Sequence, residues 1–215
     1  MKWLWFYGSI ALFVAGFACA VWYRAYKVGV ARESAHFTPS SFPISSLPPS
    51  EADEGVVSHI RGKVQIDRRG GDAPIPLTAD GPILQGESLA VLGVGSATIS
   101  FTNGVLADLG TYGEVALVDT IPTEFLLAES GGTVTYTVGN SPLAVRVGIT
   151  VVQSQNAEYT VRYTPATKSM MLLVKKGIVT VGYEDTENTT HTAAVHAGQS
   201  FTVNGTTRLS RLRGV

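Results

Sequence analysis

Cysteine is nearly missing from this 215-residue chain, which contains only Cys19. A single cysteine cannot form an intramolecular disulfide. Because residues 20–215 hold no thiol, a cysteine-ligated zinc site and a thiol enzyme are excluded there. Charged residues are also scarce, at 15% of the chain, well below the usual quarter of a globular protein. Low charge together with 23 glycines favours β-structure with many turns over a helical bundle.

The few charges are unevenly spread along the chain. Between Glu51 and Thr207 there are 16 acidic and 9 basic residues, so this part carries a net charge of −7. Because nucleic-acid binding needs a basic face that neutralises phosphates, we expect no nucleic-acid partner. The other basic residues stand near the two ends of the chain, as Lys2, Arg24, Lys27, Arg32, Arg208, Arg211 and Arg213.

Charge is absent altogether from residues 3–23, which read WLWFYGSIALFVAGFACAVWY. As a helix this run spans roughly 30 Å, the thickness of the hydrocarbon core of a bilayer. Aromatic residues stand at both of its ends, where they prefer the lipid–water boundary. We therefore predict a signal-anchor transmembrane helix with its flank over residues 1–32. Signal-peptide cleavage near Ala18–Ala20 and lipid modification of Cys19 are the two alternatives.

Residues 33–54 are rich in proline and serine. Proline fixes φ and removes backbone donors, so neither helix nor sheet is expected here. We predict a flexible linker that reaches about 70 Å when fully extended.

After Gly55 the sequence shows the two-residue period of β-strands and no convincing amphipathic helix. Asn103-Gly104 is a strong hairpin signal, and the unbroken apolar run Met170–Val174 indicates a strand buried on both faces. We predict an all-β domain over residues 55–207, a sandwich or irregular β-roll of about a dozen short strands. A short, frayed basic tail is expected at 208–215. The clearest alternating runs are Ser96–Thr102, Thr133–Val138, Leu143–Gly148 and Tyr159–Thr164.

A glycine directly precedes three of the β-runs, at Gly62, Gly132 and Gly177. The two intervals between them differ, which excludes a solenoid of fixed period and suggests similar β-units stacked irregularly.

Several short motifs follow one another in an order that matches a known family. They are Gly62–Ile66, Leu84–Phe101 with its Gly86-Glu87 turn, Phe101–Gly110 with its Asn103-Gly104 turn, Leu127–Val138, Val174–Val181 and the closing Ala197-Gly198-Gln199. Over about residues 57–203 the chain resembles the FecR domain, the extracytoplasmic β-domain of iron-dicitrate-type regulators. That family usually has a Gly-Asp turn where this chain has Gly86-Glu87, and an Asp-Gly turn where it has Asn103-Gly104.

The resemblance implies an extracytoplasmic β-domain held at the cell membrane. Ahead of the membrane helix, regulators of this family usually carry a cytoplasmic domain that binds a sigma factor. Because only Met1 and Lys2 precede the predicted helix, we do not expect that function here. By the positive-inside rule, the charges of Arg24, Lys27 and Arg32 slightly favour the opposite orientation, with the β-domain in the cytoplasm. We give more weight to the resemblance and to the linker over residues 33–54, and so expect the β-domain outside the cytoplasm.

No catalytic, cofactor-binding or metal-binding residues are predicted, and no enzyme is expected. The sequence lacks a nucleophile-elbow motif, a phosphate loop and a dinucleotide fingerprint. His191 and His196 are five apart, which places them on opposite faces of a strand and disfavours a shared metal. Asp108 and Glu114 flank one turn and stay a weak candidate for a paired-carboxylate site. The acidic clusters Glu51/Asp53/Glu54 and Glu184/Asp185/Glu187 do not match a calcium loop and are expected to be solvated.

These observations favour a membrane-anchored extracytoplasmic β-domain that acts as a non-enzymatic binding or assembly module at the cell envelope. Its working surface would be a sheet face or edge that recognises a protein or an envelope polysaccharide. The alternative is a regulator that signals through a partner in or across the membrane.

Overall fold

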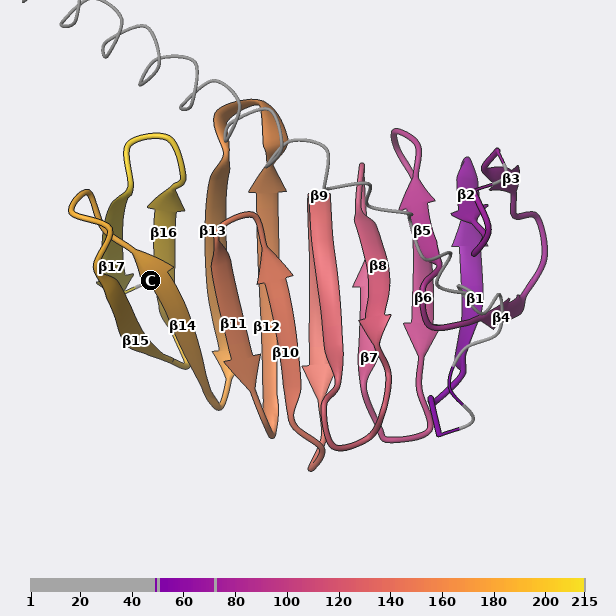
Figure 1. Ribbon diagram of the computed structural model, residues 1–215, viewed down its shortest axis with the longest axis horizontal. Helices are drawn as coiled ribbons and strands as arrows, with labels where there is room; N and C mark the ends of the chain where they lie inside the picture. Colours follow the sequence, from indigo (N-terminus) through magenta and orange to yellow (C-terminus); the bar gives the residue numbers. More distant parts are fainter. Residues whose placement is uncertain (1–48, 50, 72, 215) are drawn as a thin grey trace, which may run out of the picture. The chain divides into compact units, whose positions relative to one another are not determined.

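Strands make up nearly all of the regular structure in the computed structural model, which describes residues 49, 51–71 and 73–214 (Figure 1). The one helical element in these ranges is the single 3₁₀ turn η1, Pro165–Thr167. The predicted helix at 3–23 and nearly all of the predicted linker lie outside the described residues. Among the described residues, no helix has the length and apolar character needed to cross a bilayer.

The prediction of an all-β domain is confirmed, whereas the expected dozen strands is too few, because the described chain forms 17. The strands Ile75–Pro76 and Gly81–Ile83 are too short to leave an alternating pattern in the sequence, and the strand Leu209–Gly214 lies in the predicted tail. The strands are β1 Gly55–Arg61, β2 Val64–Asp67, β3 Ile75–Pro76, β4 Gly81–Ile83, β5 Ser88–Val91, β6 Ser96–Ser100, β7 Leu106–Leu109, β8 Glu114–Asp119, β9 Leu126–Val138, β10 Leu143–Val147, β11 Thr150–Ser154, β12 Ala157–Thr164, β13 Ser169–Lys176, β14 Ile178–Glu184, β15 Thr190–His196, β16 Gln199–Asn204 and β17 Leu209–Gly214.

All 17 strands belong to one mixed sheet that is folded into two stacked layers (Figure 1). Layer I contains, in spatial order, β4, β1, β6, β7, the second half of β9, β12, β13, β16 and β17. Layer II contains β3, β2, β5, β8, the first half of β9, β10, β11, β14 and β15. The long strand β9 therefore joins the layers, and its pairing with β10 is parallel while the other pairings are antiparallel.

After β9 the chain builds the two layers alternately. The hairpins β10–β11 and β14–β15 add to layer II, and β12–β13 and β16–β17 add to layer I. Each hairpin pairs with the one before it in the same layer, so the stack grows in one direction. Figure 1 shows the result, with β3 and β4 at one end and β15 and β17 at the other.

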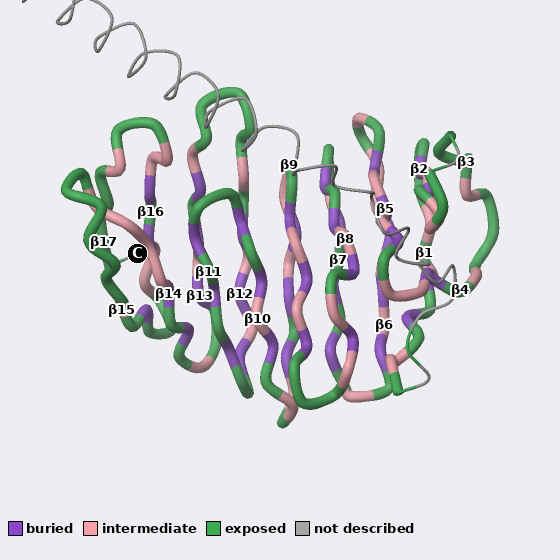
Figure 2. The backbone as a smooth tube through the Cα atoms, in the orientation of Figure 1, coloured by how far each residue is buried: buried purple, intermediate pink, exposed green. Residues whose placement is uncertain are grey.

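The core lies between the layers, where the inward side chains of every second residue meet. Figure 2 shows buried residues alternating with more exposed ones along the strands. Tyr183 of layer II packs on Phe201 of layer I with ring centroids 5.2 Å apart. The prediction that Met170–Val174 is buried on both faces is wrong. In β13, Met170, Leu172 and Val174 are buried, but Met171 points outward and is 39% exposed.

All three recurrent glycines mark corners where the chain changes layer. Gly62 stands between β1 and β2, with φ of +78°. Gly132 stands within β9 and Gly177 between β13 and β14, with φ of +78° and +80°. A Cβ on Gly132 would lie 2.1 Å from the carbonyl carbon and oxygen of Tyr112, and one on Gly177 would lie 2.5 Å from the oxygen of Asn156. A side chain is thus excluded at the Gly132 and Gly177 corners by neighbouring backbone as well as by the positive φ.

The hairpin predicted at Asn103-Gly104 is confirmed, since it joins the paired strands β6 and β7. The amide of Phe101 donates to the oxygen of Val105 at 3.0 Å, so the loop has three residues. Gly104 has a φ of +84° and Asn103 is not among the positive-φ residues, which excludes a type I′ turn. The prediction of a frayed tail at 208–215 is wrong. Leu209–Gly214 forms β17 and pairs antiparallel with β16 along its whole length.

Candidate binding edge

Asp108 and Glu114, the candidate carboxylate pair, do not come together. Asp108 lies on the outer face of layer I, where it accepts a hydrogen bond of 2.7 Å from Thr98 Oγ1. Glu114 begins β8 on the outer face of layer II. Stacked layers stand about 10 Å apart and these two side chains point away from each other, so they cannot flank one scissile bond.

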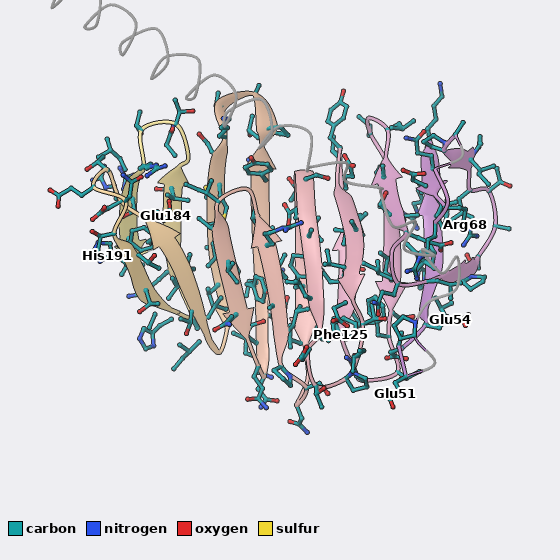
Figure 3. All side chains as sticks on the ribbon, in the orientation of Figure 1. Glu51, Glu54, Arg68, Phe125, Glu184 and His191 are labelled. Atoms are coloured by element: carbon teal, nitrogen blue, oxygen red, sulfur yellow. The ribbon has the colours of Figure 1, made fainter. Side chains whose placement is uncertain are left out.

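The acidic cluster Glu184/Asp185/Glu187 forms the turn of the β14–β15 hairpin, where Asp185 organises the backbone. Its carboxylate accepts hydrogen bonds from the amides of Glu187 (2.8 Å) and Thr189 (3.0 Å), and Nε2 of His191 lies 2.6 Å away. The Thr189 amide, followed by His191, lowers the pKa of Asp185 below its usual value. Glu184 and His191 lie at the same end of the domain, opposite Arg68 (Figure 3). His196 is exposed on the other face of β15, as predicted, so the two histidines do not share a site.

The other acidic cluster also has a structural role, carried by Asp53. Its carboxylate accepts hydrogen bonds from Thr102 Oγ1 (2.7 Å) and from the amides of Thr102 (3.0 Å) and Asn103 (3.3 Å). These hydrogen bonds hold the segment before β1 against the β6–β7 turn. In the ranges that the structure describes, no group of three metal-ligating side chains gathers.

Sequence reasoning missed a buried polar cluster that links the two layers. Glu129 is 2% exposed and accepts a hydrogen bond of 3.1 Å from the Tyr136 hydroxyl, while its Oε1 has no hydrogen-bond partner among the described residues. Ser154 of layer II donates to the Tyr159 hydroxyl of layer I at 3.1 Å, and the rings of Tyr136 and Tyr159 stack. Burial raises the pKa of Glu129 well above its usual value. The sequence did contain a signal, because Glu129 has the same alternation parity as Leu127, which is buried.

A groove of about 630 Å³ lies on the outer face of layer II. Its floor is formed by neighbouring strands through Leu126, Ala144, Gln153 and Thr180, which are aligned across the sheet. Glu124 is its one charged lining residue, so the groove offers a single carboxylate without an adjacent base.

The two ends of the stack differ in how their edges are protected. At one end the edge strands β3 and β4 have only two and three residues, and each contains a proline, Pro76 and Pro82. Arg68 also donates to the oxygen of Pro82 at 3.1 Å and pairs with the buried Glu87 at 2.8 Å. Short strands and proline are devices that prevent a further strand from pairing, so this edge is blocked.

The opposite end carries two long edge strands without proline, β15 and β17. In the described part of the chain each pairs with one neighbour only, β14 and β16 respectively. On β15 the ladder bond from the amide of Ala197 to the oxygen of Gly177 fixes the alternation, so Thr192 and Ala194 direct their amides to the open side. We call this end, β15 and β17 together, the open edge.

Comparison with known proteins supports the fold. No family model matches the chain, and no curated protein matches it. Two crystal structures, each described as that of a "putative anti-sigma factor" from Parabacteroides distasonis, are similar, with TM-scores of 0.51 and 0.50 at 15% and 18% sequence identity. In both, the match covers 59% of this chain and 59% of the other. The chain therefore shares a fold with part of those proteins, and at this identity the likeness carries no more than the fold.

Proposed function

We propose that this protein is a FecR-like, membrane-anchored binding module whose β-domain lies outside the cytoplasm and recruits a protein partner through the open edge. The observation that carries the proposal is the difference between the two ends. One end is blocked by short proline-containing strands, whereas the long strands of the other have no partner on their outer side among residues 51–71 and 73–214. An unpaired edge presents a row of backbone donors and acceptors, which is the surface that strand addition uses.

The membrane anchor and the outward location rest on the sequence. The uncharged run over residues 3–23 and the linker after it suit a tethered domain. The FecR resemblance of residues 57–203 favours the outward orientation, and the fold shared with the two solved structures is compatible with that family.

Photo-crosslinking in intact cells tests the proposal. A photoreactive amino acid is placed at Leu209, which is 67% exposed on the open edge, or at Ile75, which is 50% exposed on the blocked edge. We expect a discrete protein adduct from Leu209 and none from Ile75. Absence of an adduct from Leu209, or the same adducts from both positions, would contradict binding at the open edge.

A signalling regulator is the second candidate, favoured by the description of the two similar structures as anti-sigma factors. It differs from a tethered module in what it requires of the membrane helix. Replacing Trp3–Tyr23 by an unrelated spanning helix should abolish the action of a regulator that works through a helix partner. A module that only needs to be held at the membrane should tolerate the replacement.

A further inference from the structure

Strand β17 differs from β15 in carrying two exposed arginines. Arg211 pairs across the strands with Thr202, and Arg213 with Ser200, so both side chains lie on the outer face of layer I. Neither arginine forms an ion pair with a residue that the structure describes. Arg208 is in a different situation, because it already contacts Glu184 at 3.6 Å and the side chain of Asn188.

The strands of layer I beyond β16 contain little compensating negative charge. The acidic β14–β15 turn lies at the same end, where Arg208 contacts Glu184 and His191 contacts Asp185. In β12 and β13 and the turn between them there are four basic residues and one acid, Glu158, which is paired with Lys175 at 3.1 Å. Arg162 and Arg211 belong to one row across layer I, with Met171 and Thr202 between them. This part of a domain that is acidic as a whole therefore favours an anionic partner.

The other face of β17 carries one apolar side chain, Leu212, between Ser210 and Gly214, and this side chain is incompletely covered. Leu212 pairs with the buried Phe201 and so points toward the core side of layer I, yet it is 47% exposed. An apolar side chain on an added strand would cover Leu212 and extend the core beyond Phe201.

We propose that β17 accepts an extended segment of a partner protein in which acidic and apolar residues alternate. Acidic side chains two residues apart would stand opposite Arg211 and Arg213, and the apolar residue between them would cover Leu212. Pairing of β17 with a second copy of itself is disfavoured, because antiparallel self-pairing places the arginines of the two copies beside each other. The inference rests on the proposed function and adds the chemistry of the partner.

The test uses two short probe peptides with the full chain. The acidic probe is the blocked hexapeptide Thr-Glu-Val-Glu-Val-Thr, and the basic probe replaces both glutamates by lysine. Hydrogen exchange of residues 209–214, read by mass spectrometry, reports binding. We expect the acidic probe to slow exchange in this segment, with a half-saturating concentration at least about tenfold lower than that of the basic probe.

A charge-reversed variant makes the test reciprocal. In Arg211→Glu/Arg213→Glu the preference should invert, so that the basic probe protects the segment. Arg146→Glu, on the exposed outer face of layer II, is the control and should leave the preference unchanged. N-methylation of alternate residues of the acidic probe should abolish protection for one of the two alternate sets, because strand addition needs backbone donors.

Equal protection by both probes, no protection by either, or protection confined to another strand would overturn the inference. These results are separable from failure of the proposed function. A partner crosslinked at Leu209 together with an inactive acidic probe means that the open edge binds but prefers a different chemistry.

Discussion

At the scale of single residues, the least expected feature is the carboxyl group of Glu129 in the core. A lone buried carboxylate is costly, and burial is the main cause of the raised pKa of Glu129. Its hydrogen bond with Tyr136 joins the two halves of β9, which belong to different layers. The neighbouring hydrogen bond from Ser154 to Tyr159 also links layer II to layer I. The sequence pattern placed Glu129 on the inward parity, but the alternation alone does not reveal the layer change at Gly132.

Glu129 predicts a specific dependence of stability on pH. A raised pKa in the folded state means that its contribution to stability is complete below the usual glutamate pKa and is lost as pH rises through the folded value. Glu129→Gln cannot ionise and keeps an acceptor for Tyr136. We expect this variant to gain on the order of 1 kcal/mol over the wild type at neutral pH, or about 2–4 °C in Tm. Thermal unfolding from pH 4 to 8 checks this, and a gain that does not shrink toward pH 4 would contradict it.

Substituting Gly132 and Gly198 separates the cost of a positive φ from the cost of the close backbone contact at the Gly132 corner. Both have φ near +77°, at +78° and +76°, but only at Gly132 would a Cβ meet backbone, since nothing lies within 4 Å at Gly198. Gly198→Ala should cost about 1 kcal/mol for the positive φ alone. Gly132→Ala should cost at least about 3 kcal/mol or prevent folding, because β9 and the backbone of Tyr112 must also move apart. Denaturant unfolding measures the difference, and equal costs would show that the close approach is unimportant.

At the scale of elements, the alternating runs identified β6, the second half of β9, β10 and β12, because in each of these runs one face packs on a core. The pattern failed where burial does not alternate. Strands β3 and β4 are too short to show a period, and β17 is exposed throughout, so its residues resemble a frayed tail. Strand β17 is held by its backbone pairing with β16. Backbone pairing does not alter the hydrophobic pattern of a sequence, so this strand could not be predicted from that pattern.

The segment before β1 is predicted to depend on Asp53. Asp53→Ala removes the acceptor for two amides and one hydroxyl in the β6–β7 turn, so we expect a loss of about 1–3 kcal/mol in the free energy of unfolding. Glu51→Ala, two positions away and exposed, serves as the control and should change stability by less than about 0.5 kcal/mol. Similar losses in the two variants would argue against this role of Asp53.

At the scale of the whole molecule, the alternation of hairpins between two layers produces a stack with two unlike ends. The sequence predicted an all-β domain with a FecR-like order of turns. It did not predict which strands lie at the ends, because that depends on pairings between segments far apart in the chain. The candidate site could therefore be anticipated only as a sheet face or edge, and the structure is needed to single out the open edge.

The proposed topology makes its own prediction for the intact protein. With an epitope tag after Val215, protease added to intact cells should digest the β-domain, and mass spectrometry should find Met1 retained. Protection of the domain until the cytoplasmic membrane is broken would instead follow the charges of Arg24, Lys27 and Arg32.

The most direct test of the account is amide hydrogen exchange of the edge strands, compared between the purified full chain and the same chain in native membranes. If the open edge recruits a partner, residues 209–214 should exchange markedly more slowly in native membranes, while β3 and β4 of the blocked edge stay unchanged. Identical exchange of β15 and β17 in both preparations would contradict the claim that this edge is the binding surface.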